Sequence, residues 1–140
     1  MKTIVLLLAF SAAGFFACKP TRYTTENLPD RQLRWGNGGG YVGKETTYTL
    51  LDNGQVFVRE TGGKLAETTN TKPKKAKVLY ETMGSLGLST LDFQHPGNIY
   101  NFIEVLNGTD INRISWGEKG HAVDQQVQDL YRQLNELVKK

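Results

Sequence analysis

The sequence of 140 residues is poor in several residue types that often define a protein's chemistry: it contains one cysteine, two histidines and four prolines. Because Cys18 is the only cysteine, no intramolecular disulfide can form. His95 and His121 have no cysteine ligands and no short metal-ligand spacing, so we expect no metal centre. The 17 basic and 14 acidic residues nearly balance and form no long basic stripe, which argues against binding to nucleic acid.

A long apolar run is present from residue 4 to residue 17, shortly after Lys2 at the start of the chain. An early cation followed by about a dozen apolar and small residues is typical of a secretory signal. The run is too short to cross a bilayer comfortably as a helix, which takes ~20 apolar residues. We therefore predict that residues 1–17 are a signal peptide that is removed.

The end of this run, Phe15-Phe16-Ala17-Cys18, resembles the lipobox of bacterial lipoproteins, in which a small residue precedes a lipidated cysteine. The resemblance is confined to this leader. It implies that Cys18 becomes the mature N-terminus, carries acyl chains such as palmitate, and holds the protein at a membrane of the cell envelope, periplasmic or surface-exposed. Two or more chains give stable anchoring, because each buried methylene contributes roughly 0.8 kcal/mol. An ordinary secretory signal cut near Ala17 and an uncleaved anchor are the alternatives.

The residues that follow the cysteine are polar and show no clear apolar period, and Pro20 and Pro29 lie among them. We predict that residues 18–30 form a lipidated, partly extended tether. The rest of the chain, residues 31–140, is expected to form one domain, because single domains commonly contain ~100–150 residues.

Two Asn-Gly pairs predict β-hairpins, because both residue types tolerate the positive φ angles of a tight type I′ turn. The first pair, Asn53-Gly54, lies between expected strands at 46–51 and 55–60, and the second, Asn107-Gly108, between strands at 98–106 and 111–116. Residues 32–36 can add a fifth strand. Helices are expected from Pro73 to about Leu86 and over residues 123–138, where apolar residues recur at helical spacing.

These elements predict an α+β fold in which an antiparallel sheet of four or five strands carries two helices on one face and exposes the other to solvent. Superposing the Asn-Gly pairs sets Leu50 against Glu104, and a helix follows each hairpin. A duplicated hairpin-helix unit is therefore one hypothesis, and two unrelated hairpins are the alternative. The domain has a general likeness to small uncharacterised hairpin-helix lipoproteins of the envelope.

A glycine cluster at residues 36–43 contains the spacing G-x-G-x-x-G at Gly38, Gly40 and Gly43. In a dinucleotide site this loop must open a helix inside a parallel βαβ unit, but here a β-rich segment follows. We therefore expect a flexible or bulged connection between strands, and no cofactor. A weaker alternative is a small anionic ligand held by backbone N–H groups near Lys44. The residues of this weak ligand site are Gly38, Gly39, Gly40, Tyr41 and Lys44.

The remaining polar candidates are the two histidines and a group of lysines. His95 lies in a turn-like stretch and His121 lies near the start of the last helix, so we predict surface or helix-capping roles and assign no catalytic residue. We interpret the lysines as the solvated start of an amphipathic helix. The alternative is a surface that attracts anionic lipid or an acidic polymer. They are Lys72, Lys74, Lys75 and Lys77.

Two functions from different classes follow. The favoured one is a non-catalytic lipoprotein that binds a protein, glycan or small ligand through the open sheet face or the glycine loop, which predicts an exposed apolar or aromatic patch. The alternative is a small hydrolytic enzyme of the envelope using His95 or His121, which requires a cleft where a histidine meets a carboxylate and a nucleophile. A purely structural role predicts neither feature.

Overall fold

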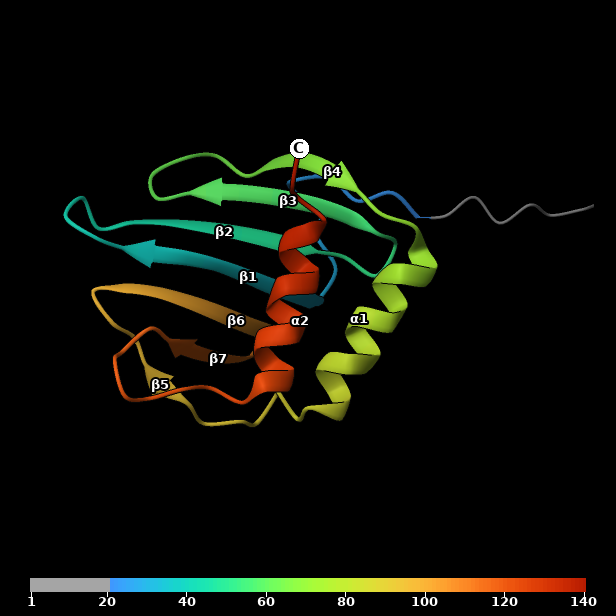
Figure 1. Cartoon of the computed structure of the whole chain (residues 1–140). Coiled ribbons are helices and arrows are strands. Elements are labelled where there is room, and N and C mark those ends of the chain that lie inside the picture. The colour runs from blue at the N-terminus through green and yellow to red at the C-terminus, as the bar shows by residue number, and fades with distance from the viewer. Residues whose placement is uncertain (1–20) are drawn as a thin grey trace, which may run out of the picture.

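The computed structural model describes residues 21–140. The predicted signal peptide and Cys18 lie outside the described residues. The described chain forms one seven-stranded sheet with two helices on the same face (Figure 1). Within this range no helix has the length and apolar character needed to span a membrane. The elements in chain order are β1 (Arg31–Gly39), β2 (Lys44–Leu50), β3 (Gln55–Glu60), β4 (Ala66–Asn70), α1 (Pro73–Ser85), β5 (Gln94–His95), β6 (Ile99–Asn107), β7 (Asp110–Trp116) and α2 (Gln125–Glu136).

Strand β1 lies at the centre of the sheet, whose order is β4-β3-β2-β1-β6-β7-β5. It pairs antiparallel with β2 on one side and with β6 on the other, and each of these strands continues into its own hairpin. The short edge strand β5 pairs with β7 in parallel, so the sheet is mixed. A single strand therefore connects the two halves of the sheet.

The hydrophobic core lies between the helices and one face of the sheet. Alternation along β1 directs Leu33 and Trp35 toward the helices, and both side chains are fully buried. Their register partners on β6 are Val105 and Ile103, which belong to the same core. The indole N–H of Trp35 donates to Asn135 Oδ1 of α2 at 3.1 Å, which adds a polar tie between sheet and helix.

Both expected helices are present, close to their predicted bounds. The apolar stripe of α2 buries Val127, Leu130 and Leu134, as its spacing predicted. Asp124 caps this helix by accepting a hydrogen bond from the N–H of Gln126 at 2.7 Å. Helix α1 begins at Pro73 and buries Ala76, Leu79, Tyr80 and Met83.

The predicted α+β class with two helices on one face is confirmed, but the predicted sheet was too small and wholly antiparallel. Two edge strands were missed. Strand β4 has four of five residues exposed and carries no apolar alternation that could mark it in the sequence. Strand β5 has only two residues, and its pairing with β7 depends on a neighbour about twenty positions away in the chain. Backbone pairing at a sheet edge leaves little trace in side-chain pattern.

The described residues do not form a repeated hairpin-helix unit. Strands β2 and β6 both run antiparallel to β1 and so point the same way, yet β3 and β7 lie on their opposite sides. Because both helices cover one face (Figure 1), no rotation superposes one unit on the other. The side-chain directions also contradict a duplication. Superposing the Asn-Gly pairs aligns Leu50 with Glu104, but Leu50 faces the core, whereas Glu104 faces away from it and pairs with Arg34.

The described part of the predicted tether, residues 21–30, contacts the folded domain. The side chain of Gln55 accepts a hydrogen bond from the N–H of Tyr23 at 2.7 Å and donates to its carbonyl at 3.1 Å. Asn53 donates to the carbonyl of Thr21 at 2.7 Å, and Arg22 pairs with Glu67 at 2.8 Å. These contacts add residues 21–30 to the folded unit, while the lipid and the tethering role stay predictions.

Tyr80 of α1 ties the helix to two neighbouring strands. Its hydroxyl accepts from the N–H of Leu33 at 3.1 Å and donates to the carbonyl of Leu50 at 2.7 Å. Burial raises the pKa of this phenol well above its ordinary value, so the hydroxyl keeps its proton and remains a donor.

Replacing Tyr80 by phenylalanine should lower the free energy of unfolding by about 1–3 kcal/mol, because the buried N–H of Leu33 loses its acceptor. Denaturant titration followed by circular dichroism measures the change. Tyr41→Phe is the matched control, since the Tyr41 ring is fully exposed and should change stability by less than about 0.5 kcal/mol. Equal effects of the two substitutions would show that the Tyr80 hydroxyl has no such role.

Candidate functional site

Four connections gather at one end of the sheet, which we call the loop end (Figure 1). Strands β1, β3, β5 and β7 finish there, because β1 ends beside the starts of β2 and β6 and the other strands follow in register. We call the opposite end, which holds the β2–β3 turn and the start of α1, the base. The loop end is formed by residues 40–43, 61–65, 96–98 and 117–124.

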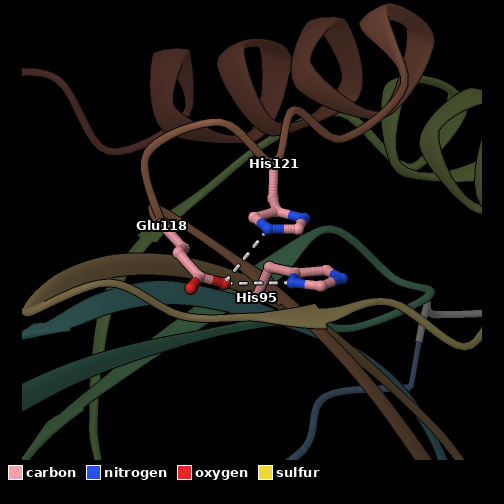
Figure 2. A group of neighbouring side chains, drawn as sticks. All are labelled: His95, Glu118 and His121. Atoms are coloured by element: carbon pink, nitrogen blue, oxygen red, sulfur yellow. Dashed lines mark hydrogen bonds and ion pairs between the residues drawn. The ribbon is translucent and has the colours of Figure 1, made fainter.

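His95, Glu118 and His121 meet at the loop end (Figure 2). His95 Nδ1 lies 3.0 Å from Glu118 Oε2, and His121 Nε2 lies 3.9 Å from the same oxygen. The two imidazole rings are stacked, with centroids 4.0 Å apart and planes inclined by 6°. One atom from each of the three side chains lies within 4.8 Å of the other two. Two nitrogen ligands and one carboxylate therefore converge at the surface.

The backbone around this cluster is fixed by hydrogen bonds. The N–H of Glu118 donates to the carbonyl of His95 at 2.9 Å, and the N–H of His121 donates to the carbonyl of Glu118 at 3.2 Å. Gly97 and Gly117 allow their two chain segments to approach each other closely, because a Cβ on Gly97 would lie 2.6 Å from the Gly117 carbonyl oxygen. The three side chains consequently extend from one short, tied frame.

From the sequence, the two histidines were predicted to be separate surface or capping residues. Both are at the surface, but Asp124 and not His121 caps α2. Their juxtaposition was not predicted, because 26 positions separate His95 from His121 in the chain. The one local signal was the spacing Glu118-x-x-His121 in a glycine-flanked loop, which sets a carboxylate and an imidazole close together.

The hydrolytic alternative requires a nucleophile beside the histidine. His95 and Glu118 supply a base and a group that orients it. Ser115 lies in the neighbouring strand, but alternation directs it to the other face of the sheet, where its hydroxyl donates to Gln94 Oε1 at 2.9 Å. A serine mechanism at His95 would need a hydroxyl from elsewhere in the chain.

The glycine cluster forms the end of β1 and the β1–β2 connection. Strand β2 follows it, so the helix that a dinucleotide site needs is replaced by a strand. Gly39 has a φ of 94°, and a Cβ there would lie 2.0 Å from the carbonyl oxygen of Asn98. Two N–H groups that an anion site would use are donated to carbonyls, from Gly40 to Asn98 at 2.8 Å and from Gly43 to Gly40 at 3.1 Å. The predicted connection between strands is thus observed, whereas ligand binding here stays a prediction.

The tip of this connection exposes apolar side chains. Tyr41 is fully exposed, and Val42 and the adjacent Ile99 are 73% and 69% exposed. Lys44, the first residue of β2, is also exposed and pairs with Gly39. An apolar group beside a cation at the end of a hairpin is a surface that suits contact with another molecule.

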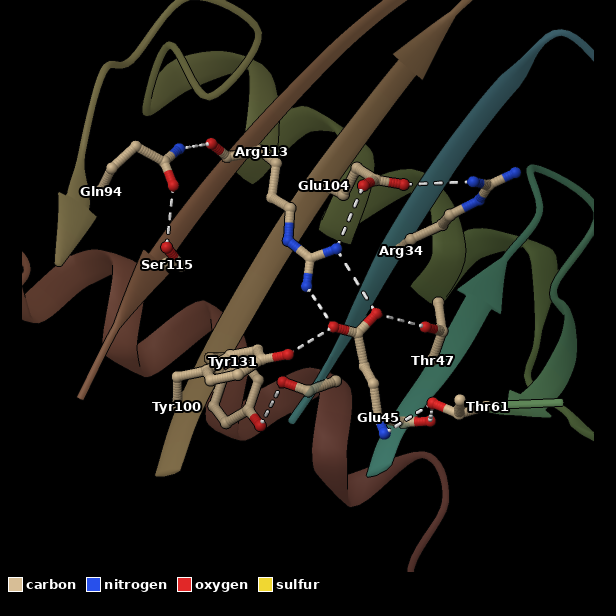
Figure 3. Close-up of polar contacts among 11 residues, drawn as sticks. Arg34, Glu45, Thr47, Thr61, Gln94, Tyr100, Glu104, Arg113, Ser115 and Tyr131 are labelled. Carbon is tan, nitrogen blue, oxygen red and sulfur yellow. Dashed lines mark hydrogen bonds and ion pairs between the residues drawn. The ribbon is translucent and has the colours of Figure 1, made fainter. Parts of the chain in front are cut away.

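The open face of the sheet, in contrast, carries a charged network (Figure 3). Arg113 donates to Glu45 Oε2 at 2.6 Å and lies 3.7 Å from Glu104, which also pairs with Arg34 at 3.1 Å. Tyr100 donates to the same Glu45 oxygen at 2.8 Å. These groups come from four adjacent strands, so the network holds the sheet together across its middle.

The aromatic ring at the centre of the open face is covered and not displayed. Phe102 is fully buried although it lies outside the main core, and the Arg113 guanidinium lies 3.7 Å from its ring centroid. The ring fits beside Gly36, its register partner, because a Cβ there would be 3.0 Å from the Phe102 ring. The aromatic patch expected on this face is therefore absent from its centre in the described chain.

Glu45 has a pKa below its ordinary value of 4.5. Burial alone would raise it, but hydrogen bonds from Arg113 and Tyr100 and the positive charge of Arg113 outweigh burial. A carboxylate with a lowered folded-state pKa adds stability above its unfolded pKa, and this stability is lost as the pH falls through the folded pKa.

Glu45→Gln should therefore flatten the pH dependence of unfolding below about pH 4.5. Wild type should lose free energy of unfolding on acidification from about pH 6 to pH 3 more steeply than the variant. Urea titration at each pH measures the slope. Glu26→Gln, at an exposed carboxylate outside the network, should keep the wild-type slope. A wild-type slope in Glu45→Gln would contradict the prediction.

Neither a model of a known protein family nor a curated protein sequence matches the chain.

Proposed function

We propose that this chain is a lipid-anchored protein of the bacterial cell envelope, periplasmic or surface-exposed, with a non-catalytic binding role performed by its loop end. The observation that carries the proposal is the place of Thr21, whose carbonyl is hydrogen-bonded to Asn53 in the β2–β3 turn at the base. Cys18 is three residues earlier, a reach of at most about 11 Å. Lipid on Cys18 would bring the base to the membrane and direct the loop end away from it.

The charge at the base supports this orientation. Lys72, Lys74 and Lys75 are exposed at the start of α1, beside the β2–β3 turn, where the N–H of Thr71 donates to the carbonyl of Gly54. The first turn of α1 has no acidic residue and no side-chain cap. The helix dipole disfavours cations there, so these lysines do not serve helix stability. Near an anionic membrane each cation would contribute about 1 kcal/mol.

The loop end carries the features expected of a binding surface. The exposed Tyr41, Val42 and Ile99 lie there. Tyrosine is one of the residue types enriched among those that contribute most to protein contacts, and the two aliphatic side chains enlarge the apolar surface of this end. The open sheet face is covered by ion pairs, so it is the weaker candidate. A small anionic ligand at Lys44 and the glycine connection remains the second option for the same end.

The anchor is tested at Cys18. Intact mass of the membrane fraction should show wild type beginning at Cys18 with a lipid-sized increment, because acylation replaces the free thiol. Cys18→Ala should accumulate as unlipidated precursor. A soluble, unmodified wild-type protein would refute the anchor and favour an ordinary secreted role.

The orientation is tested with two matched triple variants. Lys72→Gln/Lys74→Gln/Lys75→Gln should weaken binding of the full chain to vesicles containing anionic phospholipid, by several-fold at low salt, because the cations face the head groups. Lys44→Gln/Lys64→Gln/Lys119→Gln removes the same charge from the loop end and should change binding little. Sedimentation of the chains with vesicles provides the measurement. Equal losses in both variants would mean that the base does not face the membrane.

A further inference from the structure

We propose that His95, Glu118 and His121 form a binding site for a divalent transition-metal ion of the zinc and copper type. Imidazole nitrogen and carboxylate oxygen are the ligands that such ions take, and two histidines with one glutamate form a three-ligand set that leaves a further position open. The ligand atoms already lie within 4.8 Å of one another. This site goes beyond the envelope-binding role proposed above and does not depend on the lipid.

The frame of the site is prepared before any ion binds. His95 lies in β5, paired with Trp116, and its carbonyl accepts from the N–H of Glu118 at 2.9 Å. The His95 ring also packs edge-on with the ring of Phe93, with centroids 4.9 Å apart. These contacts fix two ligand-bearing residues relative to each other. A second hydrogen bond, from His121 N–H to the Glu118 carbonyl, closes the turn.

Small side-chain rotations complete the site. Ligands about 2.0–2.1 Å from a tetrahedral ion are about 3.4 Å from one another. The 3.0 Å between His95 Nδ1 and Glu118 Oε2 must therefore widen slightly, and the longer separations must contract by no more than about 1.5 Å. The lone pairs of two parallel, stacked rings cannot meet at one ion, so one imidazole must turn. Both rings can turn, because the His95 and His121 side chains are 36% and 49% exposed.

The cluster has little value as a purely structural ion pair. Glu118 is half exposed, and ion pairs at such positions contribute at most about 1 kcal/mol. A metal ion bound by both imidazoles and by the Glu118 carboxylate would link three side chains whose contacts with one another contribute little.

The test is Zn²⁺ binding to the full chain, purified in detergent without a histidine tag. Calorimetry should show one ion per chain, and Co²⁺ should give the visible absorption of a four- or five-coordinate site. His95→Gln and His121→Gln should each weaken Zn²⁺ binding at least about 10-fold, and Glu118→Gln should do the same. Glu136→Gln, at a half-exposed glutamate of α2, is the matched control and should keep wild-type affinity. Mg²⁺ should not compete, because it prefers oxygen ligands.

Two further variants make the outcome decisive. Cys18→Ala should bind Zn²⁺ as wild type does, which excludes the thiol as a ligand. His95→Gln/His121→Gln should keep its circular dichroism spectrum and lose the site, because both side chains are partly exposed and lie outside the core. Wild type that binds no Zn²⁺ at high micromolar concentration would overturn the proposal. So would a double histidine variant that binds with the affinity and stoichiometry of wild type. Neither result would bear on the lipid anchor.

Discussion

The pairing of β1 with both β2 and β6 is the constraint on which the rest of the structure depends. It joins two hairpins that have no other direct pairing in the described chain, and it directs Leu33 and Trp35 into the core beneath the helices. The other face of β1 carries Gly36, where any side chain would strike the Thr46 carbonyl oxygen at 1.8 Å. One face of β1 therefore carries large side chains that pack against the helices. The other face carries a glycine where the Phe102 ring of the neighbouring strand must lie.

The two faces of the sheet are stabilised by different interactions. One is covered by α1 and α2 and is held by apolar burial. The other is covered by ion pairs, by the described N-terminal segment, and by an arginine stacked on Phe102. Because neither face offers a large apolar surface, the features that suit recognition lie at the ends: lysines at the base, and at the loop end the exposed Tyr41 and the His95 cluster. The candidate functional surfaces consequently lie at the two ends of the strands and not on the faces of the sheet.

Local signals predicted much of the fold. Asn53-Gly54 and Asn107-Gly108 marked both reversals, and β3 has the predicted bounds of 55–60. The predicted type I′ turn was wrong, because only the glycine of each pair has a positive φ in the structure. The stripe containing Val127 and Leu130 predicted α2. These elements can be predicted from the sequence because the spacing of their apolar side chains follows from the backbone geometry of each element alone. The edge strands β4 and β5 were missed because an edge needs only backbone hydrogen bonds, which any residue except proline can supply.

The sequence by itself determined the leader pattern, the hairpins, the helices and the α+β class, since each of these depends on residues close together in the chain. Only the tertiary structure decided which strands lie side by side, which hairpin faces which way, and which polar groups meet. Leu50 and Glu104 occupy equivalent positions beside their turns yet face opposite sides, because the hairpins extend from opposite edges of β1. His95 and Glu118 lie 23 positions apart, and the parallel pairing of β5 with β7 brings them to 3.0 Å. No local pattern encodes such a contact, because it depends on strand order.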